Sequence, residues 1–438
     1  MKKGEWTRIA RGVVVLMGLA AGSAVQAAAG DALGAVFRVD TDSTRSLASD
    51  RPMLARNAAG AFVVVWSGRD PSAPLQGWRL YARTYSPAGV PQGDPVPLFD
   101  RPIPVYRSLA MDGEGNFIVT WSDLDEGRSV IKFQRFDANA QPIGGAMPVA
   151  NDARGARHAV AMNESGEFVV AWSQSTDVRI PLLIVGGGYG SISLGSSSVR
   201  ARRFGADGVA RGASLLVAAS VTNPQPITGQ SPGTPPSVDI NATGEFVVAW
   251  PDRSLLREIV RLRRYDAQAR PLDLLAPLAQ ATPPGSSPAT LPAAQAPRVR
   301  LGDDGSVMLL YSAPHAVGSG HSGGDIYAHV HAPGDARGSA SRISDHVGTS
   351  DPDVALTGDG RAISVWTDTL QPYCCMGGRV SFQILGADGS RIGGNTMVFD
   401  GTHPEYPAVA SDAAGNFVLA WVSGGAQAVV QARMFAGY

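Results

Sequence analysis

A short motif that recurs seven times along the chain constrains its fold more than any other feature. In each copy a glycine is followed six residues later by an aromatic residue, and the residues between them are mostly apolar, as in AGAFVVVW, which ends at Trp66. The seven aromatic positions are Trp66, Trp121, Trp172, Trp250, Tyr311, Trp366 and Trp421. A repeat of this kind indicates an array of similar structural units rather than a set of unrelated domains.

Each copy predicts a unit of four antiparallel strands. A first strand, preceded by proline in five copies, leads through a turn to a buried second strand that ends at the aromatic residue. The turn opens with Asn or Asp in most copies, which caps such turns, and closes with the glycine, which adopts positive φ at low cost. A third strand follows, such as ARRF ending at Phe204, and then a fourth, such as AMPVA at 146–150.

The last copy lacks its fourth strand, because the chain ends at Tyr438 just after the third. A matching fourth-strand pattern lies at residues 34–40, near the other end. An N-terminal strand that completes the last repeat would close the array into a ring and remove its exposed edges. We therefore predict an all-β fold, a seven-bladed β-propeller of four-stranded antiparallel blades with 3+1 closure, as one domain over residues 34–438.

The repeats resemble a β-propeller-like repeat of exported bacterial proteins, with the pattern P-x-V-A, then D-x-x-G-x-F-V-V-x-W, then A-R-R-F-D-x-x-G. The resemblance covers essentially the whole mature chain. It implies the propeller architecture but no catalytic residues, since proteins that carry such repeats are mostly uncharacterised. The repeated tryptophans and glycines are expected to serve blade packing and turn geometry.

Residues 1–27 have the pattern of a secretory signal peptide. A cationic start is followed by the apolar run 13–21, and Val25-Gln26-Ala27 offers small residues for cleavage. The run is too short to span a membrane, and no cysteine follows it for lipid attachment. Residues 28–33 would form a short leader. We expect an exported protein, periplasmic or extracellular, that is neither a lipoprotein nor inserted in the membrane.

Composition excludes several classes of protein. Charged residues are 17% of the chain, and it contains 52 glycines and 31 prolines, which argues against a long helical or coiled-coil protein. The formal net charge is −1, and no basic stripe with interleaved aromatics is present, so nucleic acid is not an expected partner. A monomer without cofactor is expected.

The added length falls in a few connections, such as residues 173–198, which should all open on one face of the ring. Binding sites of repeat proteins are usually on such an elaborated face. The candidate ligand-binding residues on this face are Trp78, Tyr106, Tyr189, Tyr373, Tyr406, Asp123, Asp252 and Asp368. They could line a pocket for a glycan or a protein ligand, or simply be the polar residues that any loop contains.

Two local features of these loops carry separate predictions. Cys374 and Cys375 are adjacent, so in an oxidising compartment they form a vicinal disulfide or remain as free or intermolecularly paired thiols. His315 and His321 are weak metal candidates, because they match no fixed ligand spacing, and no metal site is predicted.

The functional prediction is a non-catalytic binding or interaction module that uses the elaborated face. No H-E-x-x-H motif occurs in the chain, no nucleophile elbow between a strand and a helix is predicted, and catalytic residues stay unknown. Two alternatives remain open at this point. One is a hydrolase or lyase that acts on a glycan or peptide, and the other is a structural component of an envelope assembly.

Overall fold

The computed structural model describes residues 27–46, 51–69, 78–99, 105–125, 128–151, 157–184, 188–221, 235–254, 257–272, 278–281, 295–314, 324–335, 338–345, 349–369, 378–400, 405–423 and 428–437. Nearly all of the predicted signal peptide lies outside these ranges. Strands dominate the described residues, together with one short 3-10 helix, η1 (Asp42–Thr44). No helix in these ranges is long and apolar enough to cross a membrane.

Consecutive strands pair antiparallel in groups of four, and each group coincides with one copy of the motif. The first three groups are β3 (Met53–Arg56), β4 (Phe62–Arg69), β5 (Arg79–Tyr85) and β6 (Val96–Pro97); β7 (Val105–Met111), β8 (Phe117–Asp125), β9 (Arg128–Phe136) and β10 (Pro142–Ala150); and β11 (Arg157–Met162), β12 (Phe168–Ile184), β13 (Gly188–Phe204) and β14 (Leu215–Val221).

The next three groups follow the same order. They are β15 (Ser237–Ile240), β16 (Phe246–Ser254), β17 (Arg257–Tyr265) and β18 (Leu278–Ala281); β19 (Gln295–Leu301), β20 (Val307–Pro314), β21 (Gly324–His331) and β22 (Ser339–Arg342); and β23 (Thr349–Leu356), β24 (Ala362–Thr369), β25 (Gly378–Leu385) and β26 (Arg391–Asp400). The last two groups join one continuous sheet through a single pair, Gly324 with Thr349.

The final group takes one strand from the N-terminal side. It contains β27 (Glu405–Ser411), β28 (Phe417–Ser423), β29 (Val429–Phe435) and β1 (Phe37–Arg38), with Phe37 opposite Ala432. The predicted pairing of an N-terminal strand with the last repeat is therefore confirmed. A further short strand, β2 (Arg45–Ser46), pairs with the end of β4.

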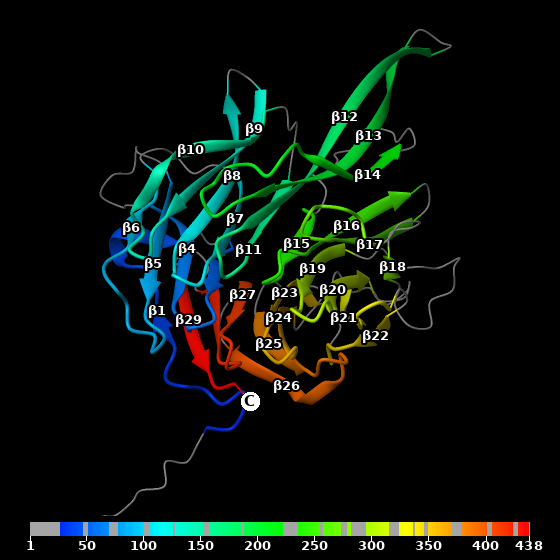
Figure 1. The fold of residues 1–438 in the computed structure, drawn as a ribbon. Coiled ribbons are helices and arrows are strands. Elements are labelled where there is room, and N and C mark those ends of the chain that lie inside the picture. Colours follow the sequence, from blue (N-terminus) through cyan, green and yellow to red (C-terminus); the bar gives the residue numbers. More distant parts are fainter. Residues whose placement is uncertain are drawn as a thin grey trace, which may run out of the picture.

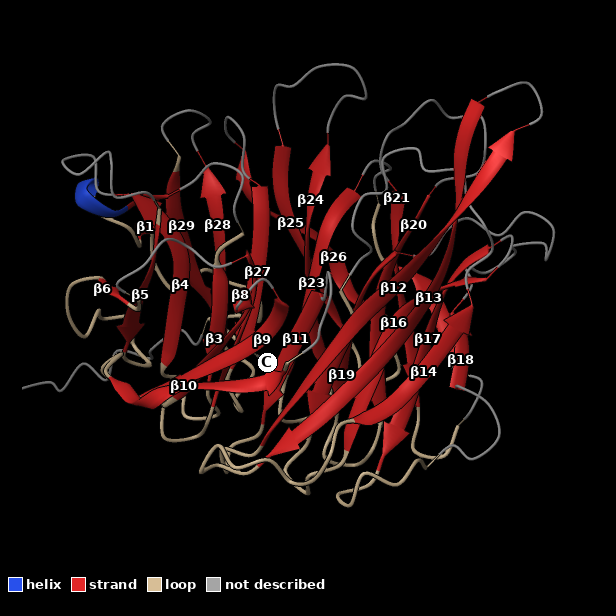
Figure 2. Cartoon of the chain, turned by 90° about the horizontal axis from the view of Figure 1, so that it is seen from above, coloured by secondary structure: helices blue, strands red, loops and turns tan. Residues whose placement is uncertain are grey.

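The first strand of each group is the innermost one. β3, β7, β11, β15, β19, β23 and β27 each contact the next, and β27 contacts β3, so these inner strands close a ring. Figure 1 looks into this ring, and Figure 2 shows the strands from the side. The predicted all-β propeller of four-stranded antiparallel sheets is confirmed, and we number its blades 1 to 7 in chain order, the described residues providing all seven groups.

The core lies between neighbouring blades. Trp172 of blade 3 packs with Ile131 and Phe133 of blade 2, and Trp421 of blade 7 packs with Phe382 of blade 6. Each of these tryptophans buries a large apolar area between two sheets, which is the main stabilising contribution of such a residue. The predicted packing role of the repeated aromatic residues is confirmed.

The turns between the first and second strands have the predicted chemistry. The Asn57 side-chain oxygen accepts a hydrogen bond from the Ala61 N–H at 2.9 Å, and Asp412 accepts one from the Asn416 N–H at 2.8 Å. The glycine that closes this turn has positive φ in every blade, for example 92° at Gly60. These turns lie at one end of the strands, drawn tan at the lower edge of Figure 2. We call this end the turn face and the opposite end the loop face.

One predicted loop is instead part of a long hairpin. Residues 173–198 were expected to form an insertion between two strands, but β12 and β13 run on as a ladder of seventeen consecutive pairs, from Phe168–Phe204 to Ile184–Gly188. The inserted sequence contains Val178, Ile180 and Ile192, whose β-branched side chains favour strands. The hairpin projects beyond the other blades at the loop face (Figures 1 and 2).

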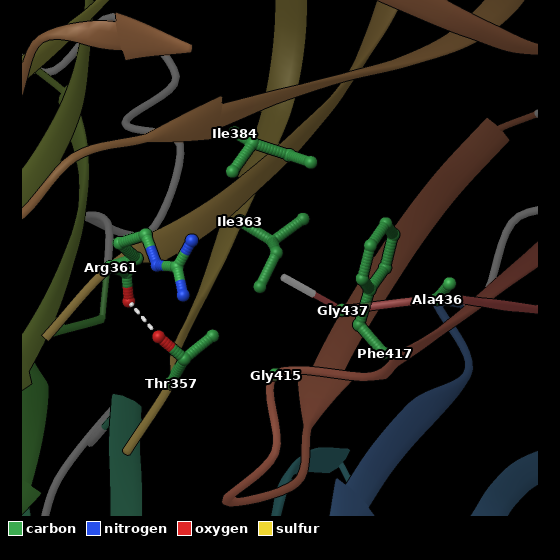
Figure 3. A pocket seen from close by; sticks show the side chains of 8 residues that line it. All are labelled: Thr357, Arg361, Ile363, Ile384, Gly415, Phe417, Ala436 and Gly437. Atoms are coloured by element: carbon green, nitrogen blue, oxygen red, sulfur yellow. Dashed lines mark hydrogen bonds between the residues drawn. The ribbon is translucent and has the colours of Figure 1, made fainter. Parts of the chain in front are cut away.

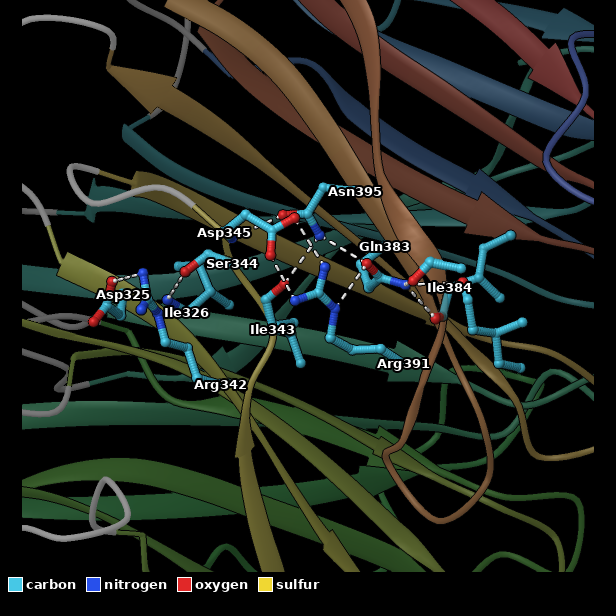
Figure 4. A network of polar contacts seen from close by, with 12 residues as sticks. Asp325, Ile326, Arg342, Ile343, Ser344, Asp345, Gln383, Ile384, Arg391 and Asn395 are labelled. Atoms are coloured by element: carbon cyan, nitrogen blue, oxygen red, sulfur yellow. Dashed lines mark hydrogen bonds and ion pairs between the residues drawn. The ribbon is translucent and has the colours of Figure 1, made fainter.

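Polar contacts also join blades at the outer rim. Between blades 5 and 6, Arg391 forms two ion-pair contacts with Asp345, at 2.6 and 2.9 Å. The Asn395 amide nitrogen donates to the Ile343 carbonyl at 3.0 Å and to Gln383 at 2.7 Å (Figure 4). These contacts fix the relative positions of two blades whose inner strands reach the central channel.

Candidate functional site

One backbone position recurs at the loop-face end of every inner strand. It immediately precedes the residue that is proline in five copies. Its occupants are Arg51, Tyr106, Arg157, Pro235, Ala296, Asp351 and Tyr406. Because the inner strands form a closed ring, these residues encircle the channel at the loop face, and we call them the throat residues.

Four throat residues have a strained backbone. Tyr106, Ala296, Asp351 and Tyr406 have φ between 49° and 56°, although none is glycine. The pairing of the inner strand with its neighbour is also interrupted at each of these residues. Such a bulge re-aims a side chain, and a left-handed conformation costs a non-glycine residue about 1–2 kcal/mol. Strain of this kind concentrates at functional sites, which makes the throat the candidate site.

Arg51 reaches across the throat. Its guanidinium donates to the Asp351 carbonyl oxygen at 2.7 Å, which joins blade 1 to blade 6 past the end of blade 7. Arg298 of blade 5 lies close to both, with its Nε 3.6 Å from Asp353 Oδ1. Burial, followed by the charge of Arg51, lowers the pKa of Arg298 to about 10. Blades 1 and 5, which are not adjacent in the ring, therefore bring two arginines together beside blade 6.

A second pair of throat residues lies on blades 2 and 3. The guanidinium carbon of Arg157 is 4.6 Å from the ring centroid of Tyr106, which is a cation–π contact. Beside Arg157, the buried His158 has its Nδ1 3.3 Å from the Ser122 hydroxyl. Burial lowers the pKa of His158 to about 4, so this histidine is neutral at neutral pH. The throat thus offers guanidinium donors, phenol groups and carboxylates.

The three aspartates predicted as ligand contacts take part in the blade walls. Asp368 is 3% exposed and accepts from the Trp366 indole N–H and the Ser381 hydroxyl, both at 2.6 Å. Asp252 is ion-paired with Arg261. Asp123 lies 3.6 Å from the Lys132 ammonium group. These carboxylates are engaged by groups of their own blades rather than grouped around a common point.

The remaining candidates differ in how far the structure describes them. Trp78 is half-buried and lies at the loop-face start of β5. Tyr189 belongs to the long hairpin, opposite Leu183. Tyr373, the adjacent pair Cys374 and Cys375, and the metal candidates His315 and His321 lie outside the described residues. Within the described ranges no group of three or more His, Cys, Asp or Glu side chains could hold a metal ion.

A cavity of about 1000 Å³ runs along the inner strands of all seven blades to the turn face. Its wall carries many more acidic than basic side chains. The acidic residues are Glu164, Asp239, Asp303, Asp304, Asp335, Asp359, Asp388 and Asp412, and the basic ones are Arg56 and Arg300. Several of these carboxylates cap turns, as Glu164 does by accepting from the Ala58 N–H at 3.1 Å. The loop-based prediction did not anticipate a cavity at this face.

A much smaller pocket lies between blades 6 and 7 at the same face (Figure 3). Its lining includes Thr357, Ile363 and Phe417, and the Thr357 hydroxyl donates to the Arg361 carbonyl at 2.9 Å. Its volume of about 10 Å³ has room for one water molecule. It therefore belongs to the packing between blades and is too small for a substrate.

Sequence reasoning placed Tyr106 and Tyr406 at the loop face but missed Arg51, Arg157 and Arg298. A signal was available in the internal alignment, because the throat position holds arginine, tyrosine or aspartate in five copies while the position after it is proline in five copies. The side chains that meet across the ring could not be paired from the sequence, since they are up to 300 residues apart.

Comparisons with known proteins support the fold. Neither a family model nor a curated protein matches the chain. Among solved structures, the polysaccharide lyase Uly1 has a TM-score of 0.51 and 8% identity, over 93% of this chain and 100% of that one. An ulvan lyase of a new polysaccharide lyase family, bound to -[GlcA(1-4)Rha3S]-, has a TM-score of 0.50 and 9% identity, over 92% of this chain and 96% of the lyase. These neighbours are β-propellers, and at such identities the likeness concerns the fold.

Proposed function

We propose that the protein acts on a polysaccharide at the loop face of its propeller, as a hydrolase or a lyase. The observation that carries this proposal is the throat, where arginines and tyrosines from several blades lie at the end of the channel and four of the seven throat residues have a strained backbone. The fold that this chain shares with two polysaccharide lyases over almost its whole length adds support.

The throat residues fit the needs of glycan chemistry. Tyrosine rings provide flat surfaces against which sugars pack, and a tyrosine hydroxyl can carry a proton to or from a reacting group. Guanidinium groups stabilise negative charge that develops in a transition state, and they do so more strongly in a channel partly shielded from water. Tyr106, beside Arg157, combines both groups within one contact.

A specific observation favours a second candidate function, a glycan-binding module without catalysis. A glycosidase uses two carboxyl groups that face each other across a cleft. Asp123, Asp252 and Asp368 are each held by partners in their own blade. All three of these carboxylates are already engaged, so they give the hydrolase mechanism less support than the lyase or the binding module.

The protein, purified without the predicted signal peptide of residues 1–27, can be incubated with ulvan, arabinan, pectin and neutral glucans. Two readouts separate the candidates, namely the ultraviolet absorbance of the unsaturated sugar that a lyase creates and the reducing ends that either enzyme releases. Affinity electrophoresis in gels that contain these polysaccharides detects binding without cleavage. We expect product or retardation with at least one polysaccharide, and loss of either in Tyr106→Ala. Absence of both with every polysaccharide would overturn the proposal.

A further inference from the structure

We propose that the throat is an anion site that selects polysaccharides carrying carboxylate or sulfate groups. This inference rests on the proposed function and adds the substrate class to it. Three features support it, namely the arginines at the throat, the lack of a carboxylate at ion-pair distance from Arg51 or Arg157 among the described residues, and the opposite charge at the other end of the channel.

Arg51 and Arg157 differ from the arginines that form ion pairs within the described residues. Arg56, Arg261 and Arg342 each form an ion pair with an aspartate. Among the described residues, by contrast, no carboxylate lies within ion-pair distance of Arg51 or Arg157. Arg51 donates to a backbone carbonyl, and Arg157 lies over an aromatic ring. Within the described part of the chain, both guanidinium groups therefore keep N–H donors for a planar anion.

Arg298 adds a second positive charge next to Arg51. Its nearest carboxylate, Asp353, is 3.6 Å away and also accepts the Val409 N–H at 3.2 Å, so it neutralises Arg298 only in part. Two guanidinium groups held close together in a partly buried site repel each other. An anion bound between them would relieve this repulsion, which the folded protein carries when the site is empty.

Among the described residues, the two ends of the channel carry opposite charge. At the turn face the cavity wall carries eight acidic side chains against two arginines. At the loop face the throat carries Arg51 and Arg157, with Arg298 just inside, against Asp351 and Asp353. An anionic chain is therefore attracted to the loop face and repelled from the turn face, because fields of this kind are focused along a channel with low-dielectric walls.

The first arm of the test uses small probes, so that it does not depend on the reaction. Glucuronate, inorganic sulfate and glucose are titrated calorimetrically at constant ionic strength into the wild type, Arg51→Ala, Arg51→Lys, Arg157→Ala and the control Arg270→Ala. Arg270 is 74% exposed at a turn-face loop, so its loss changes the net charge equally. We expect glucuronate, sulfate or both to bind, glucose not to bind, and affinity to fall about tenfold in each alanine variant of the throat.

The second arm uses polysaccharides in matched pairs, glucuronan with its carboxyl-reduced form and ulvan with its desulfated form. Binding lost on carboxyl reduction identifies carboxylate as the selected group, and binding lost on desulfation identifies sulfate. Thermal unfolding of every variant checks that it is folded, and Arg157→Ala, on a different blade, provides a second test if Arg51→Ala does not fold.

The outcomes separate the two proposals. Anion binding that is unchanged in both Arg51→Ala and Arg157→Ala overturns the anion site. Equal binding of charged and neutral polysaccharides overturns the selection but leaves the proposed function intact. Throat-dependent binding of small anions, with no polysaccharide bound, overturns the proposed function and supports the anion site. If nothing binds in either arm, both proposals are wrong.

Discussion

The buried ion pair between blades 1 and 7 is expected to hold the closed ring together. Arg56 and Asp412 are 2.7 Å apart, and their side chains are 1% and 8% exposed. The Arg56 Nε also donates to the Gly60 carbonyl at 3.1 Å. Because burial lowers the pKa of Arg56 and Asp412 opposes that shift, the charged guanidinium depends on this aspartate. Replacement of Arg56 by methionine removes the charge and keeps most of the volume.

The size of the effect follows from what is left behind. Removing one partner of a buried ion pair costs about 3–5 kcal/mol, because the other charge loses its counter-ion. Asp412 keeps two hydrogen bonds from Asn416, at 2.8 and 3.1 Å, which still stabilise its carboxylate. We therefore expect Arg56→Met to lower the free energy of unfolding by about 3 kcal/mol, at the lower end of that range.

Urea unfolding followed by tryptophan fluorescence measures this change, since the repeated tryptophans are buried between blades. The double variant Arg56→Met/Asp412→Asn should be more stable than the sum of the two single changes predicts, because it leaves no unpaired charge. Arg270→Ala breaks an exposed pair with Asp266 and should leave the free energy of unfolding almost unchanged. If Arg56→Met lowers the free energy of unfolding by less than about 1 kcal/mol, no more than Arg270→Ala does, the ion pair does not hold the ring together.

Three further predictions concern stability. Gly60→Ala should destabilise the protein more than Gly305→Ala. Both glycines have positive φ, but an added Cβ at Gly60 would lie 3.0 Å from the Arg56 guanidinium, whereas one at Gly305 would have no atom within 4 Å. The urea midpoints of the two variants measure the difference. Burial lowers the pKa of His158 and of His331 to about 4, so between pH 6.5 and about 4 the unfolded chain binds protons that the folded protein does not. The free energy of unfolding should therefore decrease as the pH is lowered through this range, by up to about 3 kcal/mol per histidine. In His331→Phe the free energy of unfolding, measured across the same range, should depend less on pH than in the wild type. Trp421→Ala should cost about 3–5 kcal/mol by leaving a cavity between blades 6 and 7, and calorimetric unfolding should show it.

The fold was predictable because two structural positions in each repeat are chemically restrictive. Only glycine closes the first turn at low cost, and only a large aromatic fills the space between sheets, so both recur and reveal the strand order. The extension of the β12 and β13 hairpin beyond Trp172 was not predictable, since residues 173–198 contain no further glycine-to-aromatic motif. Its strands continue the ladder through backbone pairing, which tolerates many side chains.

For the candidate site, the sequence predicts which face of the propeller carries it but not which side chains meet there. Tyr106 and Tyr406 could be assigned to the loop face because they adjoin variable connections. Asp368 was a reasonable surface candidate by sequence, yet its position two residues after Trp366 places it against the indole N–H, where it is buried. Arg51 and Arg298 meet only because the ring closes, and a contact that depends on closure has no local signal in the sequence.

The throat combines a shared backbone position with side chains that differ from blade to blade, and this combination favours a functional role. At the glycine and tryptophan positions, packing and turn geometry require the same residue in nearly every copy. At the throat the fold tolerates proline and alanine in blades 4 and 5, so it requires no charged or aromatic residue there. Arg51, Tyr106 and Arg157 are therefore not explained by the architecture. Binding of an anionic ligand explains both their chemistry and their position at the end of the channel opposite the acidic cavity.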